Sequence, residues 1–258
     1  MKLLLLLMLV LVNKIPVVAQ VELPIKLHVG VSSIMSKRYM DESFTTLFSE
    51  DGIFFQKEDY NRKGYIIKSE YHFRDNDKIK IIEVQYSYNE YDMISTMKTF
   101  INSDLDSTVY FNYLDSLVIL EEYDYLNMKS VNYEYYLDDN KKIVKAVIQH
   151  LNPITQRAYK TIIQTYNKDL GENILEISAF IDDTEESKLI QIYGEAGFVE
   201  TEIFYRDGYL KGSATYYFYN FHEGYWLNEI VEYYLMGDNS GFIVEKEFWA
   251  YTIDFVSN

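Results

Sequence analysis

The sequence predicts an all-β protein: a long antiparallel meander of about 15 short strands, coiled or closed on itself, with one short N-terminal helix. Three observations predict this fold. Apolar and polar residues alternate over short stretches, polar turn residues separate those stretches, and the pattern recurs every 12 to 15 residues. With 48% hydrophobic and 25% charged residues, the chain has enough apolar side chains for a substantial core.

The first residues have the pattern of an export leader. Lys2 precedes an unbroken apolar run from Leu3 to Val12, and small residues follow at Val17 and Ala19. This pattern is typical of a secretory signal peptide over residues 1–19. The apolar run is roughly half as long as the ~20 residues of a membrane-spanning helix, so we expect no transmembrane helix.

Residues 20–51 form an N-terminal segment with the one predicted helix. Asp41 is a suitable N-cap, and Gly52 lies just beyond the helix end. Val21–Val31 alternates weakly and offers an extra strand. The apolar residues that recur at helical spacing are Met40, Phe44, Leu47 and Phe48.

Residues 52–258 form the predicted β-repeat domain, with strands from Gly52 to Phe255. One unit shows the pattern: Val131–Leu137 alternates, Asp138–Lys142 favours a turn, and Ile143–Ile148 is rich in β-branched residues. Together they predict a β-hairpin. The same device recurs without a gap in units that begin at Tyr60, Phe73, Tyr88, Ile101, Tyr113, Tyr125, Leu137, Leu151, Tyr166, Ile181, Tyr193, Tyr205, Tyr219 and Tyr234.

These units resemble the YD repeats of the RHS family, in which Tyr-Asp-x-x-Gly precedes an aliphatic strand. The residues that carry the resemblance are Tyr60, Asn61, Gly64 and Ile66, and then Tyr88, Asn89 and Ile94. The segment Phe204–Asn220 also resembles a MORN repeat. The resemblance implies a β-rich surface or secreted protein, and carbohydrate or protein binding.

One stretch of the repeat domain is unusually aromatic. We interpret its side chains as an exposed platform that stacks on sugar rings or buries a partner's apolar surface. Cross-strand packing is the alternative reading and the commoner use of strand aromatics. The predicted ligand-binding residues of the platform are Tyr217, Tyr219, Tyr225 and Trp226, with Tyr216, Phe218 and Phe221 beside them.

Composition excludes several kinds of partner and site. The chain has no cysteine, hence no disulfide, thiolate metal site or cysteine nucleophile. Its formal charge is −16, and loss of Lys2 and Lys14 with the leader makes it −18. Nucleic acid is a poor partner for so acidic a protein. Glycans and other proteins remain suitable partners.

The sequence contains no recognised catalytic or metal-binding motif, so we predict no cofactor. The histidines are scattered, and acidic turns such as Asp104–Asp106 and Asp182–Asp183 lack the spacing of a calcium loop. We interpret them as solvated turns. Glu200 and Glu202 lie on one strand face, and a solvated face is again preferred to a glycosidase pair.

We therefore predict a secreted, periplasmic or cell-surface protein that is not an enzyme and binds a glycan or a protein partner. One alternative is an outer-membrane β-barrel. Two observations argue against it. The predicted turns are all similarly short, and the predicted strands have about eight residues, whereas membrane strands need about 9–11. A second, weaker alternative is a secreted glycan hydrolase with an unrecognised acidic site.

Overall fold

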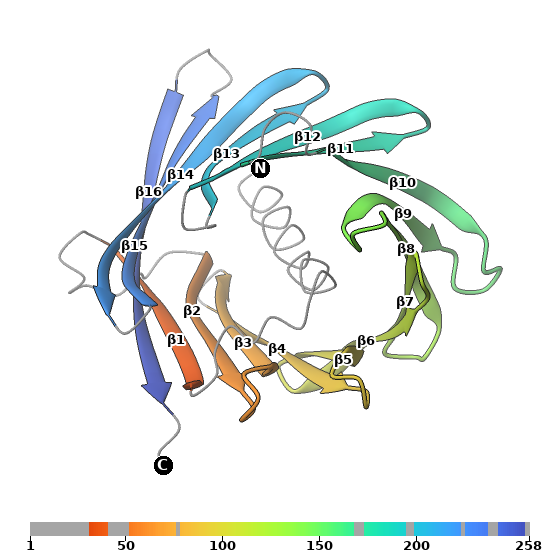
Figure 1. The fold of residues 1–258 in the computed structure, drawn as a ribbon, viewed down its shortest axis with the longest axis horizontal. Helices are drawn as coiled ribbons and strands as arrows, with labels where there is room; N and C mark the ends of the chain where they lie inside the picture. The colour runs from red at the N-terminus through yellow and green to blue at the C-terminus, as the bar shows by residue number, and fades with distance from the viewer. Residues whose placement is uncertain are drawn as a thin grey trace.

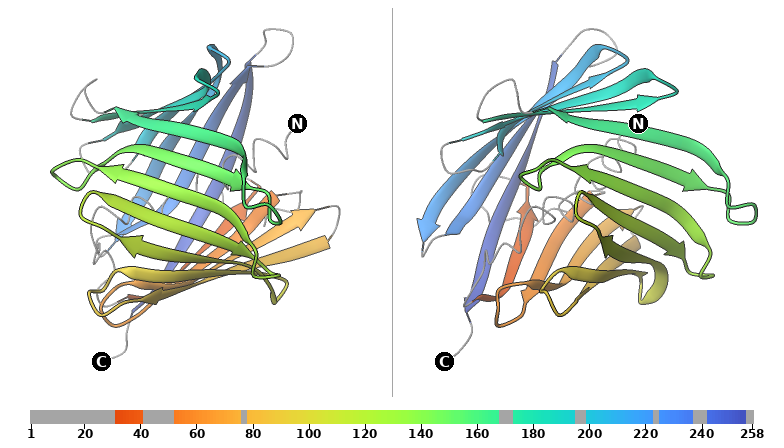
Figure 2. Two further views of the ribbon diagram at one scale, coloured as in Figure 1. Left: turned by 90° about the vertical axis from the view of Figure 1, so that its right-hand side faces the viewer. Right: turned by 45° about the vertical axis from the view of Figure 1, so that its right-hand side comes forward.

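The chain forms a closed barrel of sixteen antiparallel β-strands in a computed structural model (Figure 1; Figure 2). The residues that the structure describes are 31–40, 52–75, 78–167, 173–194, 199–222, 225–236 and 242–255. The strands are β1 (Val31–Tyr39), β2 (Gly52–Tyr60), β3 (Ile66–Asp75), β4 (Lys78–Tyr88), β5 (Ile94–Ile101), β6 (Asp104–Tyr113), β7 (Leu117–Asp124), β8 (Lys129–Leu137), β9 (Ile143–Leu151), β10 (Ala158–Asn167), β11 (Ile174–Ile181), β12 (Thr184–Tyr193), β13 (Val199–Arg206), β14 (Tyr209–His222), β15 (Tyr225–Met236) and β16 (Phe242–Phe255).

The seam between β1 and β16 closes the barrel. Every other pairing joins strands that are neighbours in the sequence, whereas this one joins β1, which also pairs with β2, to β16. At the seam, Ile34 lies opposite Ile253 and Ser36 lies opposite Tyr251. Closure leaves no unpaired strand edge in the sheet, and an exposed edge would otherwise template aggregation.

Asparagine and aspartate residues build the hairpin turns, as the sequence predicts. At Asn61, Asn89, Asp124 and Asp138, Oδ1 accepts hydrogen bonds of 2.8–3.1 Å from backbone N–H groups two and four residues further on. The residue three positions after each of them has φ between 59° and 84°. In these turns the side-chain oxygen of an asparagine or an aspartate therefore satisfies backbone N–H groups, without a metal ion.

The all-β meander is confirmed, and two details differ from expectation. β2 begins at Gly52 and β16 ends at Phe255, the limits predicted for the meander. Strand lengths range from 8 to 14 residues, and twelve of the sixteen strands are longer than the predicted eight, so strand length no longer argues against a membrane barrel. β1 adds a strand at residues 31–39.

The predicted leader and helix lie outside the described residues, as does most of the extra strand predicted at Val21–Val31. Among the described residues, no helix has the length and hydrophobicity of a membrane span.

Alternate residues of each strand fall on two faces of the wall. On β8, Tyr135 is 5% exposed and Tyr136 is 37% exposed. Tyr135 lies opposite Val118 and Ala146, which are also buried, so the buried set continues across strands. Ile53 of β2 packs against the buried cluster of β14–β16, although β1 lies between β2 and β16. Contacts that skip a strand form on the concave side, where side chains converge. We therefore call the buried set the lumen face and the opposite set the outer face.

Candidate functional site

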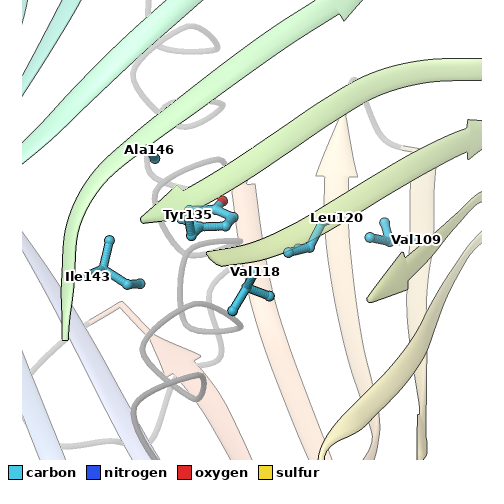
Figure 3. Packing of buried hydrophobic residues seen from close by; sticks show 6 residues of the cluster. All are labelled: Val109, Val118, Leu120, Tyr135, Ile143 and Ala146. Atoms are coloured by element: carbon cyan, nitrogen blue, oxygen red, sulfur yellow. The ribbon is translucent and has the colours of Figure 1, made fainter. Parts of the chain in front are cut away.

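The lumen face of β5–β10 is aromatic and aliphatic. Figure 3 shows its buried centre, which spans β6 to β9 and consists of Val109, Val118, Leu120, Tyr135, Ile143 and Ala146. Met97 and Phe111 are among the partly buried side chains packed against it. The rings of Tyr133 and Tyr135 are stacked, with centroids 6.3 Å apart and planes at 4°. We call this surface the aromatic wall.

The lumen face of β12–β16, β1 and β2 is different because it contains carboxylates. Tyr216 donates a 2.7 Å hydrogen bond to Glu202 Oε2, and Gln191 Nε2 donates one of 2.7 Å to Oε1 of the same residue. Arg38 forms a 3.0 Å ion pair with Glu247. We call this surface the acid wall. Its carboxylates include Glu58, Glu202, Glu229 and Glu247, each hydrogen-bonded to a side chain of the wall.

Burial changes the ionisation of the lumen-face groups. It raises the pKa of Glu58 and Glu229, while hydrogen bonds from Tyr60 and Tyr251 act in the opposite direction. Burial also raises the pKa of Tyr166 to about 12. The tyrosine hydroxyls of the lumen therefore keep their protons at neutral pH and remain hydrogen-bond donors. The arrangement is suited to binding a mostly apolar molecule with a few hydrogen-bonding groups.

Ion pairs are spread over the outer face. Lys68 on β3 lies 3.2 Å from Glu70 and 2.5 Å from Glu83 on β4. Further pairs occur around the barrel between β7 and β8, β11 and β12, and β15 and β16; they are Glu121–Lys129, Glu176–Lys188 and Glu232–Lys246. Except for Lys129, which begins β8, these charges lie inside the strands at positions that face outward. The outer face thus carries charges, beside exposed apolar residues such as Ile79 and Ile81, at the height where a membrane barrel has its apolar band.

The predicted aromatic platform is divided between the two faces. Tyr217 and Tyr219 are exposed on the outer face, whereas Tyr216 lies on the lumen face, where it contacts Glu202. Tyr225 begins β15, and its side chain and that of Trp226 lie outside the described part of the structure. Ligand binding by these four residues stays a prediction.

The interpretation of Glu202 as a solvated residue is wrong. Glu202 is 7% exposed and lies opposite Gln191 and Ala214 on the lumen face. Sequence reasoning also missed Glu229 and Tyr251 of the acid wall. Their positions in the alternation of β15 and β16 were a usable signal, but the lumen face could be chosen only once the strand pairing was known. Within the described residues, no cluster of His, Asp and Glu has the arrangement of a metal site.

No family model and no curated protein matches this sequence. Among solved structures, a porin-like protein from Bacteroides uniformis ATCC 8492 is similar, with a TM-score of 0.59 and 10% sequence identity. The match covers 88% of this chain and 98% of that protein.

At this identity the match shows the fold alone. Closure and the porin-like neighbour favour the predicted barrel alternative over the secreted sheet that binds a glycan or a protein. The resemblance to YD and MORN repeats stays a prediction, because neither the fold nor the match bears on it.

Proposed function

We propose that this protein is an exported, porin-like β-barrel that stands in water and holds an amphiphilic, mainly apolar molecule in its lumen. One observation carries the proposal: the aromatic wall faces inward, while ion pairs lie on the outer face. The predicted export leader and the porin-like neighbour are compatible with a place in the cell envelope or at the cell surface.

The outer face favours water over lipid as the surrounding medium. A charged residue at the lipid-facing midplane of a membrane barrel costs about 2–4 kcal/mol for Lys or Arg, and less for Asp or Glu. Charged residues of the outer face occur on strands around the barrel, among them Lys68 on β3, Glu121 on β7, Lys188 on β12 and Lys246 on β15. In water, the same ion pairs cost almost nothing to expose.

The lumen face favours an apolar cargo. A barrel of sixteen strands is too wide for its own wall side chains to fill. Apolar surface removed from water stabilises a complex by about 25 cal/mol per Å². An acyl chain or fused ring system against the aromatic wall gains this stabilisation, and the tyrosines and carboxylates of the acid wall offer hydrogen bonds to its polar end.

The second candidate is an outer-membrane barrel. Closure, an even strand number, strands of 8 to 14 residues and the porin-like neighbour favour it. It requires lipid to cover the outer face, and the ion pairs there argue against that.

A probe-binding experiment tests the first proposal. Residues 20–258 are purified without detergent and titrated with the fluorescent apolar probe N-phenylnaphthylamine. We expect a soluble barrel with saturable binding. Phe111→Ala removes a ring from the aromatic wall and should weaken binding at least about fivefold. Tyr110→Ala is the matched control, because it removes a ring from the outer face of the same strand.

Three outcomes contradict the proposal. Soluble protein that does not bind the probe would contradict the proposal that the lumen holds an apolar molecule. Equal loss of probe affinity in Phe111→Ala and Tyr110→Ala would show that the probe does not bind in the lumen. Protein that is insoluble without detergent and conducts ions in planar bilayers supports the outer-membrane barrel instead.

A further inference from the structure

The hairpin of β9 and β10 differs in charge from the rest of the chain. The protein has 40 acidic and 24 basic residues, yet residues 140–168 contain no Asp or Glu. The two strands and their turn, residues 143–167, include Lys145, Arg157 and Lys160. We call this segment the basic hairpin. A locally positive segment in a strongly acidic protein favours an anionic partner at that place.

Two side chains of the basic hairpin face the lumen. His150 of β9 and Lys160 of β10 lie opposite each other. His150 also lies opposite the buried Val131 of β8, and Lys160 lies two positions before Ile162, which pairs with Ile148 of the lumen face. Lys145 points the other way, because it lies over the ring of Tyr136 on the outer face.

Lys160 differs from the paired lysines of the outer face. Lys129 and Lys188 form ion pairs with Glu121 and Glu176. Among the described residues, no carboxylate forms an ion pair with Lys160. The described lumen face of β8–β11 contains no Asp or Glu at all. The ammonium group of Lys160 is therefore available to an anion that enters the lumen.

His150 adds a second donor beside this ammonium group. Burial lowers the pKa of His150 and Lys160 lowers it further, whereas Glu122 of β7 acts in the opposite direction. A neutral imidazole keeps one N–H donor. Glu122 accepts a 2.9 Å hydrogen bond from Tyr133 and lies three strands, or about 14 Å along the sheet, from Lys160. The two donors therefore lie apart from the carboxylate of the aromatic wall.

Apolar side chains lie directly beside the two donors. The neighbouring row of the lumen face crosses β7 to β10 and belongs to the aromatic wall or continues it. Its members pair across the strands in the order Leu120, Tyr133, Ile148 and Ile162. A molecule with its head at Lys160 thus meets apolar surface with the part that follows the head.

We propose that the cargo of the lumen is an amphiphile with an anionic head, such as a long-chain carboxylate, and that Lys160 and His150 bind this head while the apolar body lies on the aromatic wall. The inference rests on the proposed function and names the chemical class of the molecule. Hydrogen bonds from charged donors to a carboxylate are stronger than those between neutral groups, so the head selects among molecules with the same apolar body.

The acid wall favours the same orientation. β9 and β10 lie on the opposite side of the barrel from β1 and β16 (Figure 1). The carboxylates of the acid wall repel an anionic head and accept hydrogen bonds from hydroxyl groups. The basic hairpin supplies donors instead. An anionic head is thus directed to Lys160, and hydroxyl groups elsewhere on the molecule suit the acid wall.

Displacement of N-phenylnaphthylamine from residues 20–258 tests the proposal. Decanoate, 1-decanol and decylamine have the same chain and differ in the charge of the head. We expect decanoate to bind at least about fivefold more tightly than 1-decanol, because it forms charged hydrogen bonds with Lys160. Decylamine should bind more weakly than decanoate.

Three variants identify the residue that binds the head. Lys160→Gln should remove most of the preference for decanoate over 1-decanol, and Lys160→Arg should keep it. Lys145→Gln is the matched control, because it changes the net charge equally on the outer face of the same hairpin. The probe is uncharged, so all three variants should bind it with wild-type affinity, which also shows that they are folded.

Four results would overturn the inference. Equal affinity of the wild-type protein for decanoate and 1-decanol would exclude an anionic head while leaving the proposed function intact. Tighter binding of decylamine would place the head at the acid wall. Equal loss of the preference in Lys160→Gln and Lys145→Gln, or loss in neither, would show that Lys160 does not bind the head. A wild-type protein that does not bind the probe would contradict the proposed function and this inference with it.

Discussion

Two tyrosine–glutamate pairs, one on each face of the barrel wall, have the same hydrogen-bond length and opposite surroundings. Tyr216 donates to Glu202 at 2.7 Å in the lumen, and Tyr136 donates to Glu134 at 2.7 Å on the outer face. Glu202 is buried, whereas Tyr136 is exposed. The same residue types therefore serve a desolvated network on one face and a hydrated surface on the other. Their position in the strand alternation decides which role they have.

The comparison also explains the abundance of tyrosine in a barrel of this kind. A tyrosine presents an apolar ring to its neighbours and a hydroxyl to a polar partner, so it suits both faces. Phenylalanine on the outer face would expose more apolar surface, and serine in the lumen would leave the aromatic wall unfilled.

The largest expected effect comes from placing a charge on each face in turn. Val118 is buried in the aromatic wall, so Val118→Asp should lower the free energy of unfolding by about 3–5 kcal/mol, the cost of an uncompensated buried charge. Ile119 is the next residue and lies on the outer face, so Ile119→Asp should cost less than about 1 kcal/mol. Urea unfolding followed by tryptophan fluorescence measures both. If Ile119→Asp lowered the free energy of unfolding by as much as Val118→Asp, the outer face would not be in water.

A smaller effect is expected from removing one hydroxyl on each face. Tyr216→Phe leaves Glu202 short of a buried hydrogen bond to a charged group and should cost about 1.5–3 kcal/mol. Tyr136→Phe removes the equivalent bond where water replaces it, and its effect should stay within about 0.5 kcal/mol. The same urea titration compares the two variants. Equal losses would show that burial does not distinguish the faces.

The pH dependence of stability should have opposite signs on the two faces. Burial raises the pKa of Glu58 and Glu229, so the folded protein binds more protons than the unfolded chain just above pH 4.5, and these groups lower stability as the pH rises through that window. On the outer face, hydrogen bonds from His72 and Lys68 respectively lower the pKa of Glu70 and Glu83. Their contribution is present above pH 4.5 and is lost as the pH falls through the folded-state pKa.

The urea midpoint measured as a function of pH separates the two contributions. In the double variant Glu58→Gln/Glu229→Gln, the urea midpoint should decline less steeply as the pH rises above 4.5. The fall of the midpoint in acid, which comes from Glu70 and Glu83, should remain. An unchanged decline would indicate that these lumen carboxylates do not titrate differently in the folded protein.

Local structure was predictable because local chemistry determines it. The turns at Asn61 and Asp138 form within five residues, so their signal is complete in the sequence. The limits of the meander at Gly52 and Phe255 follow from the same repeat. Strand lengths were underestimated where aromatic runs such as Tyr216–Tyr219 continue the strand without a polar break, which makes β14 14 residues long.

Closure and the choice of faces depend on distant pairing and were not predictable. The sheet closes because β1 pairs with β16, and these strands lie at opposite ends of the described chain. On β13, the set that includes Val199 and Ile203 is more apolar than the set that includes Glu202 and Phe204, so the alternation alone favours the wrong face as the buried one. The strand pairing corrects it, because Glu202 lies opposite the buried Ala214 on the lumen face. The candidate site could therefore be identified only from the register of the paired strands. The aromatic platform, which was predicted from the density of aromatic residues alone, is divided between the two faces.

Cysteine labelling tests most directly whether the outer face is in water, because the native chain has no cysteine to interfere. Single substitutions Ile119→Cys and Val147→Cys report on the outer face, and Leu120→Cys and Ile148→Cys report on the lumen face of the same strands. Each variant is exported and treated with a membrane-impermeant maleimide in the presence of its native envelope. A water-facing outer face predicts rapid labelling at positions 119 and 147 and slow labelling at positions 120 and 148. Protection of positions 119 and 147 by lipid would contradict it and establish the outer-membrane barrel.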